Sequence, residues 1–324
     1  MFTTPILFLV YNRPELTKRV FEQIRKIQPA YFYIAADGPR TDKLGEDEIC
    51  AEVKNIILSN IDWDCEVKTL FRDENLGCGK AVSQAITWFF KNVEEGIILE
   101  DDCLPDQSFF KFCEILLSRY KDDEEIIAIN GCNFNYTYEG EESYFFSRYM
   151  NAWGWATWKR SAKMIDYSML SWNKKPKLFF LWKRLRNKLL DLDLDWYRYW
   201  RNNFDAVAGN TIDTWDYQWQ YHQLLLGKKT IVASNNLIIN LGFGFEATHT
   251  SLNSHPAAKL QKTSILFPLI HPQIKKIVKE YEEVTIKPIW HIYSRKKNSF
   301  YLLNYLNTRP FIQFLKSKLK IVKG

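Results

Sequence analysis

The sequence predicts an α/β protein: a mainly parallel sheet flanked by helices, then a less regular half and a basic helical tail. Short apolar runs alternate with longer amphipathic ones over the first 130 residues, as in βαβ units. After about residue 140 the alternation is lost and aromatic residues crowd in. With 324 residues, 46% of them hydrophobic and 25% charged, the chain can bury a large core, which excludes a disordered or fibrous protein.

The first half supplies the predicted elements in order. Apolar runs predict strands at Ile6–Val10, Tyr31–Ala36, Glu66–Phe71, Ile97–Leu99 and Ile126–Ile129. Apolar residues at helical spacing predict helices at Glu15–Ile27, Glu46–Ser59, Gly79–Phe90 and Ser108–Tyr120. We expect three parts: a regular α/β half at 1–135, to which the resemblance given below assigns nucleotide-sugar binding, a second half of the same domain at 136–270, and a basic amphipathic extension at 271–324.

Polar residues follow each of the first four strands. They are Tyr11–Arg13, Asp37–Gly38, Arg72–Asp73 and Glu100–Asp102. Ligands of an open parallel sheet bind beyond the carboxyl ends of its strands. The candidate site is therefore expected at this edge.

Three consecutive carboxylates, Glu100, Asp101 and Asp102, end a buried strand. Their mutual repulsion is costly unless a cation or hydrogen-bond donors offset it. Mg²⁺ and Mn²⁺ prefer oxygen ligands, with substrate phosphates completing the shell. The sequence predicts a metal site here; a solvated acidic turn is the alternative.

This arrangement resembles the GT-A-fold glycosyltransferases, which use nucleotide sugars and carry an acidic motif at a strand end. The Glu-Asp-Asp spelling is most similar to the N-acetylglucosaminyltransferase I group and to related bacterial nucleotide-diphospho-sugar transferases. The resemblance covers roughly residues 5 to 250. It implies that Asp101 lies toward the ribose and that Asp102 binds Mn²⁺ or Mg²⁺.

The resemblance also implies a donor site. Arg13 would face the diphosphate, Asp37 would pair with uracil, and Asn75, Gly77 and Lys80 would belong to a segment packed against the nucleoside. The residue types agree, because a guanidinium fork suits a diphosphate and glycines permit close backbone approach at a helix start. The glycine spacing does not fit a Walker P-loop.

One acid among aromatic residues is the candidate base. Asp216 lies in Thr214–Trp219, and such surroundings raise a carboxylate's pKa and suit it to proton transfer. The segment resembles the base-bearing stretch of the N-acetylglucosaminyltransferase I group, although Tyr217 replaces a second acid. Asp213 is the competing choice, and a helix with a surface acid is the structural alternative.

Two further segments resemble parts of these enzymes. Trp153, Gly154 and Trp155 resemble the aromatic stretch that borders donor and acceptor sugars, with core packing as the alternative. His249 follows a glycine-containing loop and would reach the metal or a phosphate. A structural role for this lone histidine is the other interpretation.

The net charge of +6 is an average over two unlike parts. Nine basic residues and no acidic ones lie between Val284 and Gly324, which leaves 35 basic against 38 acidic residues elsewhere. This tail and the segment Lys174–Lys188 mix basic and apolar residues, which favours contact with an anionic membrane surface over nucleic acid. No apolar run approaches the ~20 residues needed to cross a bilayer.

The six cysteines show no C-x-x-C pair, which predicts reduced thiols in a cytoplasmic protein, at the inner face of the plasma membrane if the tail binds lipid. The expected activity is inverting transfer of a sugar, GlcNAc or another hexose, from a UDP-sugar donor to a glycan or lipid-linked acceptor in surface polysaccharide synthesis. The alternatives are a sugar-nucleotide nucleotidylyltransferase and a non-catalytic carbohydrate- or membrane-binding protein.

Overall fold

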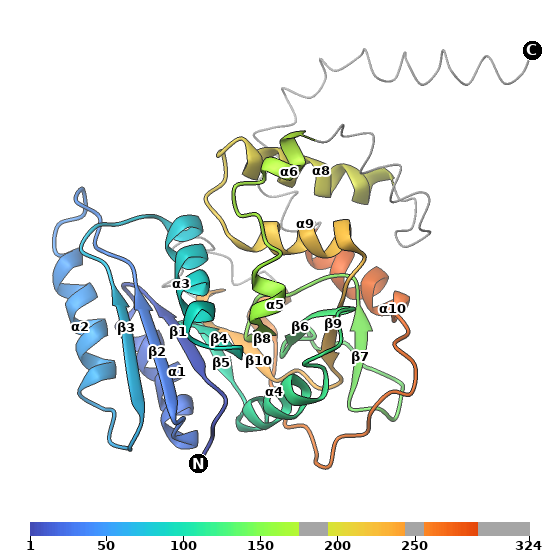
Figure 1. Ribbon diagram of the computed structural model, residues 1–324, viewed down its shortest axis with the longest axis horizontal. Coiled ribbons are helices and arrows are strands. Elements are labelled where there is room, and N and C mark those ends of the chain that lie inside the picture. Colours follow the sequence, from blue (N-terminus) through green and yellow to red (C-terminus); the bar gives the residue numbers. More distant parts are fainter. Residues whose placement is uncertain (175–193, 244–255, 291–324) are drawn as a thin grey trace, which may run out of the picture.

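A computed structural model describes residues 1–174, 194–243 and 256–290 (Figure 1). Its strands are β1 (Ile6–Val10), β2 (Tyr31–Ala36), β3 (Glu66–Phe71), β4 (Glu95–Glu100), β5 (Cys103–Pro105), β6 (Ile126–Asn130), β7 (Tyr144–Ser147), β8 (Trp155–Trp158), β9 (Lys229–Ala233) and β10 (Ile238–Asn240). Its α-helices are α1 (Pro14–Ile27), α2 (Glu46–Leu58), α3 (Cys78–Asn92), α4 (Gln107–Arg119), α5 (Lys159–Ala162), α6 (Leu170–Lys174), α8 (Leu194–Ala208), α9 (Asp216–Leu226) and α10 (Lys279–Tyr281).

Eight strands form one sheet in the order β3-β2-β1-β4-β8-β6-β9-β7. The first four are parallel, as predicted, and β8 pairs antiparallel with both β4 and β6. The α/β fold with a mostly parallel sheet is confirmed. Strands β7 to β10 were not predicted, because each has only three to five residues and aromatic or buried residues hide its alternation.

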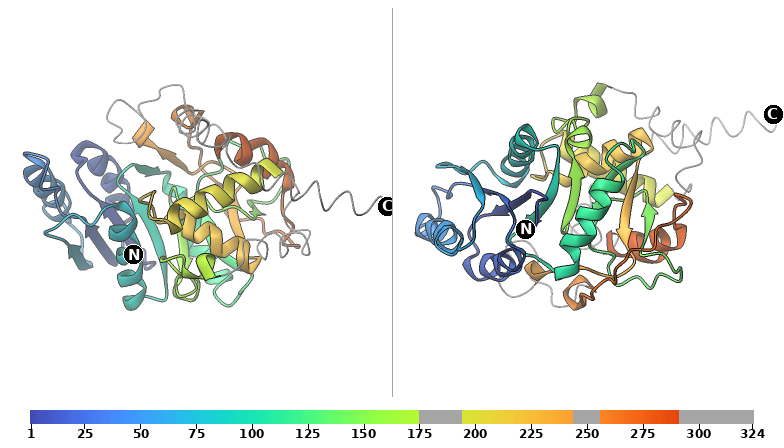
Figure 2. Two further views of the ribbon diagram at one scale, coloured as in Figure 1. Left: turned by 90° about the horizontal axis from the view of Figure 1, so that it is seen from above. Right: turned by 60° about the horizontal axis from the view of Figure 1, so that its bottom comes forward.

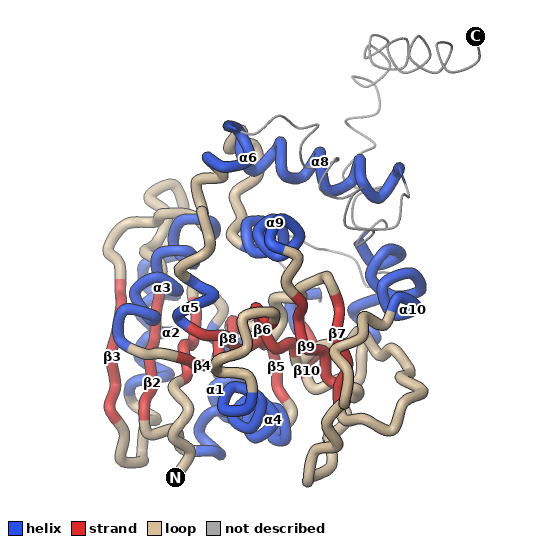
Figure 3. The backbone as a smooth tube through the Cα atoms, turned by 45° about the vertical axis from the view of Figure 1, so that its right-hand side comes forward, coloured by secondary structure: helices blue, strands red, loops and turns tan. Residues whose placement is uncertain are grey.

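Helices cover both faces of the sheet (Figure 3). Ile6, Phe8 and Val10 of β1 pack in one core cluster with residues of α1, α2 and α4. Leu7 and Leu9 point the other way and pack with α3 and with Trp219 of α9. Burial of both faces explains why these strands are continuous apolar runs rather than alternating ones.

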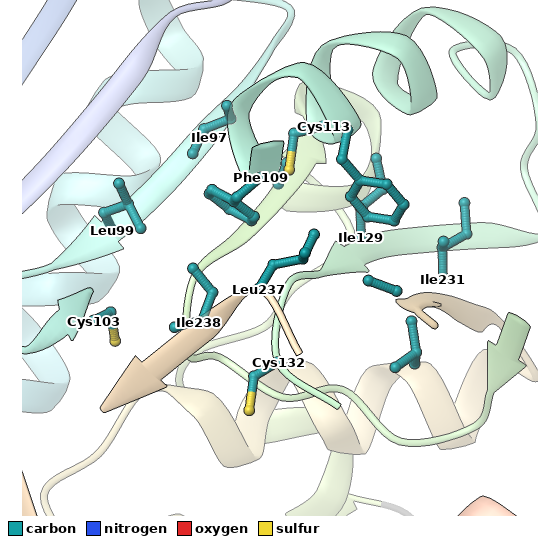
Figure 4. Packing of buried hydrophobic residues seen from close by; sticks show 14 of the residues in the cluster. Ile97, Leu99, Cys103, Phe109, Cys113, Ile129, Cys132, Ile231, Leu237 and Ile238 are labelled. Carbon is teal, nitrogen blue, oxygen red and sulfur yellow. The ribbon is translucent and has the colours of Figure 1, made fainter. Parts of the chain in front are cut away.

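The first core cluster joins the two halves of the chain (Figure 4). Phe109 and Cys113 of α4 lie with Ile129 of β6 and Ile238 of β10. All six cysteines are unpaired, and several of them are buried in this core. The prediction of reduced thiols stays a prediction.

The last described segment, 256–290, returns to the sheet, and its α10 lies at the end of the molecule opposite α2 (Figure 2). The carboxylate of Glu282 is buried and pairs with Arg148, accepting from its backbone N–H at 2.7 Å and from the Ser147 hydroxyl at 3.1 Å. The buried pair fixes this segment to the strand end of β7.

No helix among the described residues is both long and apolar enough to cross a bilayer. Residues 175–188 of the first basic segment and most of the basic tail lie outside the described residues. Their contact with a membrane surface therefore stays a prediction.

Candidate active site

The polar residues that follow β1, β2 and β4 meet at one edge of the sheet. The parallel register pairs Leu9 with Glu100 and Val10 with Ala36, so these three strands end side by side. The residues after them, beginning at Tyr11, Asp37 and Asp101, therefore form one site, as the topology predicted.

Arg13 partly neutralises the acidic cluster. Its Nη1 lies 3.2 Å from Asp101 Oδ1 and 2.9 Å from Asp102 Oδ2. Burial opposes the positive charge of Arg13, but the two aspartates outweigh it and raise the pKa of the guanidinium. The predicted side chains of Arg13, Asp101 and Asp102 are thus brought together.

Burial changes the protonation of the same cluster. It raises the pKa of Asp101 to about 7, against the lowering effect of Arg13. It also raises the pKa of Glu100 well above its usual value, with further contributions from Asp102, Asp101 and Asp216. The cluster therefore carries less than its full negative charge at neutral pH. A bound cation would lower these pKa values and restore the full charge.

Asn240 is a neighbour of Asp102 that the sequence did not reveal. Antiparallel pairing of β10 with β5 sets Asn240 opposite Cys103, and its Nδ2 lies 3.4 Å from Asp102 Oδ1. Gly242 lies so close that a Cβ there would be 2.5 Å from Asp102 Oδ2. The sequence signal for this contact was the glycine-containing segment that follows Ile239.

The carboxylate of Asp102 suits a hard divalent ion, because Mg²⁺ and Mn²⁺ prefer oxygen ligands. Asn240 turns its Nδ2 toward Asp102, and its Oδ1 accepts from the Gly242 N–H at 2.7 Å. The described residues contain no group of three or more His, Cys, Asp or Glu disposed around one ion. His249, the other predicted ligand, lies outside the described residues.

Asp37 holds the loop that precedes α3. Its carboxylate accepts from the backbone N–H groups of Gly38, Leu76 and Gly77 at 3.0–3.1 Å and from Asn75 Nδ2 at 3.1 Å. Burial raises the pKa of Asp37, while these backbone donors act against the shift. A uracil would have to share oxygens that already accept these bonds.

A buried network beside this loop was missed by the sequence reasoning. Glu46 begins α2 and accepts from the Tyr11 hydroxyl at 2.6 Å, Asn12 Nδ2 at 2.8 Å and the Arg40 backbone N–H at 2.7 Å. It also forms an ion pair with the Arg40 guanidinium. Asn75 Nδ2 joins the network by donating to the Tyr11 hydroxyl at 3.0 Å. The network fixes both segments that flank the predicted nucleoside position.

The two candidate bases have different surroundings. Asp216 begins α9, accepts from the Thr214 hydroxyl and the Tyr217 N–H, and lies close enough to raise the pKa of Glu100. Asp213 instead accepts from the Gly79 N–H at 2.8 Å. Asp216 therefore lies within electrostatic range of Glu100, and Asp213 contacts the start of α3.

The aromatic stretch is mostly core. Trp155 is fully buried and stacks on Trp215, with ring centroids 5.6 Å apart, so it has no face open to a sugar. Gly154 has φ +60°, and Ile238 occupies the place that a Cβ would take. Trp153 is half-buried, with its ring edge-on to Phe134. Of the three predicted sugar contacts, only Trp153 offers exposed aromatic surface.

Two further predicted residues lie near the first turn of α3. Gly77 has φ +81°, a backbone conformation that side chains rarely adopt, and precedes the helix. Lys80 is exposed on that turn. The sequence reasoning left Cys78 unassigned; desolvation of its sulfur, followed by the charges of Glu100, Asp216 and Asp213, raises the pKa of its thiol.

No protein-family model matches the sequence, and no curated protein is significantly similar to it. Among solved structures, the chain is similar to the mannosyltransferase PcManGT from Pyrobaculum calidifontis in complex with GDP-Man and Mn²⁺. That match has 12% identity and a TM-score of 0.31, and it covers 48% of this chain and 45% of the mannosyltransferase, less than half of its length. Mouse xyloside xylosyltransferase 1 matches with 11% identity and a TM-score of 0.33, over 69% of this chain and 82% of that one.

A third match is 4-diphosphocytidyl-2C-methyl-D-erythritol synthase from Anaerococcus prevotii. It has 8% identity and a TM-score of 0.30, and covers 53% of this chain and 79% of that chain. The structural neighbours thus include sugar transferases and nucleotidyltransferases, as the GT-A resemblance predicted. At these scores the neighbours carry no argument about activity, and the nearer resemblance to the N-acetylglucosaminyltransferase I group stays a prediction.

Proposed function

We propose that the protein is a divalent-metal-dependent glycosyltransferase that uses a nucleotide-diphospho-sugar. The observation that carries the proposal is the grouping of Arg13 with Asp101 and Asp102 at the carboxyl edge of the parallel strands, with Asp216 close by on α9. A basic fork and metal-binding carboxylates suit a diphosphate leaving group. A separate carboxylate suits proton removal from an acceptor.

Each residue then has a distinct role. Asp102 would hold Mn²⁺ or Mg²⁺, which when bound stabilises the charge of the departing nucleoside diphosphate. Arg13 would bind the same diphosphate. Asp101 would lie toward the ribose, and the loop held by Asp37 and Asn75 would border the nucleoside.

Asp216 would accept the proton of an acceptor hydroxyl as that hydroxyl attacks the anomeric carbon. The Thr214 hydroxyl and the Tyr217 N–H both donate to Asp216 Oδ1, so they orient the carboxylate. One displacement by an acceptor on the face opposite the leaving group inverts the configuration. We therefore propose an inverting transferase, and NMR of the product's anomeric proton tests this; retention would contradict it.

The finer assignments follow the family resemblance. They are UDP as the nucleotide, GlcNAc or another hexose as the sugar, a glycan or lipid-linked acceptor, and a role in surface polysaccharide synthesis. His249 is proposed as a further ligand of the metal or a phosphate. The basic tail would hold the enzyme at the inner face of the plasma membrane, near a lipid-linked acceptor.

The central experiment is a thermal-shift screen of UDP-sugars with and without Mn²⁺, followed by hydrolysis of the sugar that stabilises the protein. We expect metal-dependent stabilisation by one UDP-sugar, lost in Asp102→Ala. Asp73→Ala removes an exposed carboxylate from the same edge of the sheet and is the matched control. Stabilisation that persists in Asp102→Ala would contradict the proposal.

A nucleotidylyltransferase is the second candidate, because such an enzyme would use the same sheet edge and the same metal-binding carboxylates. Such an enzyme would release pyrophosphate from a nucleoside triphosphate and a sugar phosphate. The turn after β1, Tyr11–Pro14, has no glycines to surround a triphosphate, which favours the transferase. Pyrophosphate release would support the second candidate, and the lack of any metal-dependent nucleotide binding would favour a non-catalytic protein.

A further inference from the structure

The carboxylate of Asp213 caps a helix that begins 135 residues earlier in the chain. Its Oδ1 accepts from the Gly79 N–H at 2.8 Å, in the first turn of the 15-residue helix α3. A Cβ at Gly77 would lie 2.5 Å from Asp213 Oδ2, and one at Gly79 would lie 2.6 Å from Oδ1. Only glycines at these two positions permit the contact.

Helix α3 has no local side chain in this role: Gly77, which precedes it, has no side chain, and the first turn of α3 contains no acidic residue. Asp37 accepts from the N–H of Gly77 itself, one residue before the helix. A negative charge at a helix N-terminus is favourable, because the unpaired N–H groups point toward it. Asp213 therefore attaches the segment between α8 and α9 to the start of α3, in the first half of the chain.

The connection has a second anchor two residues later. Trp215 is 3% exposed and stacks on Trp155 of β8, with the ring planes 21° apart. The backbone between the anchors also touches α3, since Thr214 O would be 2.7 Å from a Cβ at Gly79. Asp216 follows Trp215 directly, so its position at the start of α9 depends on both anchors.

We propose that Asp213 is a positioning residue: by holding the α8–α9 connection against the start of α3, it fixes Asp216 beside the acidic cluster. This inference rests on the proposed function, in which Asp216 is the base. It assigns the two acids separate roles: Asp213 accepts a hydrogen bond, and Asp216 accepts a proton. Misplacement of a catalytic group by about 1 Å can cost about 100-fold in rate.

Two substitutions of Asp213, by asparagine and by alanine, distinguish a hydrogen-bond acceptor from a proton acceptor. Asp213→Asn keeps an oxygen that accepts from the Gly79 N–H but cannot take a proton, whereas Asp213→Ala keeps neither property. Using the full chain, Mn²⁺ and the UDP-sugar that it hydrolyses, we expect Asp213→Asn to lose less than about 10-fold in kcat and Asp213→Ala about 100-fold. Equal, complete losses in both variants, matching Asp216→Asn, would make Asp213 the base and overturn the inference.

Gly79→Ala tests the contact from the other side, because its Cβ would displace the Asp213 carboxylate and Thr214 while residue 213 remains an aspartate. We expect a loss in kcat similar to that of Asp213→Ala and no further loss in the double variant, since both changes break one contact. Additive losses would show that Asp213 acts by another route and would overturn the inference.

Amide hydrogen exchange tests whether Asp213 holds the α8–α9 connection in place, and it needs no substrate. In Asp213→Ala we expect faster amide exchange in peptides that cover residues 209–222, and near wild-type exchange in Asp213→Asn. Unchanged exchange in Asp213→Ala would overturn the inference even if the enzyme is active. If the wild type hydrolyses no UDP-sugar while exchange rises as expected, the proposed function fails and the structural contact stands.

Discussion

Replacing Glu46 with glutamine should weaken the fold at neutral pH and remove part of its sensitivity to acid. The ion pair with Arg40 requires an ionised carboxylate, and the bonds from Tyr11 and Asn12 use both of its oxygens, of which glutamine keeps only one. The Glu46 side chain is 5% exposed but that of Arg40 is 39% exposed, so solvent partly screens the ion pair. The Arg40 contact is the largest of the effects that lower the pKa of Glu46 to about 2.

The magnitude follows from linkage between protonation and folding. A pKa lowered from 4.5 to about 2 corresponds to at most about 3.5 kcal/mol, at about 1.4 kcal/mol per unit, and solvent screening at Arg40 reduces this value. Because the folded-state pKa is the lower one, this stability is fully present above pH 4.5 and is lost as the pH falls toward 2. By pH 3.5 about 1.4 kcal/mol should be gone, since the unfolded carboxyl is then about nine-tenths protonated.

Urea unfolding of the wild type and Glu46→Gln between pH 7 and pH 3.5 measures this contribution. We expect the variant to be about 2–3 kcal/mol less stable at pH 7, and the gap to narrow by about 1.4 kcal/mol at pH 3.5. Glu48→Gln changes an exposed acid on the same helix and should leave both values near wild type. A gap that stays constant with pH would refute the proposed role of the Glu46 charge.

Three further outcomes are expected. Gly242→Ala should weaken Mn²⁺ binding about 10- to 100-fold, because its Cβ would press on Asp102. Calorimetry with UDP present measures this affinity, and an unaltered affinity would exclude Asp102 as a ligand. Arg148→Met should cost about 3–5 kcal/mol in urea unfolding by leaving the Glu282 charge buried alone; adding Glu282→Leu should recover much of it, and no recovery would count against the pair. Removing residues 291–324, with eight basic and no acidic residues, should weaken binding to anionic vesicles in co-sedimentation; equal binding would exclude the tail as an anchor.

Strand positions in the first half could be predicted because both faces of the sheet are buried. Tyr31–Ala36 and Glu66–Phe71 have the bounds that were expected. Strand β8 gave no such signal, because Trp155–Trp158 is short and its place between β4 and β6 depends on pairing with residues about 30 to 60 positions away. Non-local pairing leaves no periodic mark in the sequence.

The residues of the candidate site also divide into those that could be predicted from the sequence and those that could not. Arg13, Asp101 and Asp102 directly follow neighbouring parallel strands, so topology alone brings them together. Asn240 reaches Asp102 only through the pairing of β10 with β5, across 138 positions in the chain. Glu46 was read simply as the first residue of a helix, and its burial against Tyr11 depends on how the loop after β2 folds back.

Under the proposed function, the position of Arg13 would link the binding of the metal to that of the donor. Arg13 Nη1 lies 2.9 Å from Asp102 Oδ2, the oxygen beside Gly242. A divalent cation at Asp102 would compete with Arg13 for this carboxylate, because both positive charges would lie next to the same oxygen. A diphosphate that binds Arg13 relieves this competition, so each ligand should strengthen the binding of the other. Sequence alone marked Arg13 and Asp102 as separate binding residues; their contact makes them parts of one coupled site.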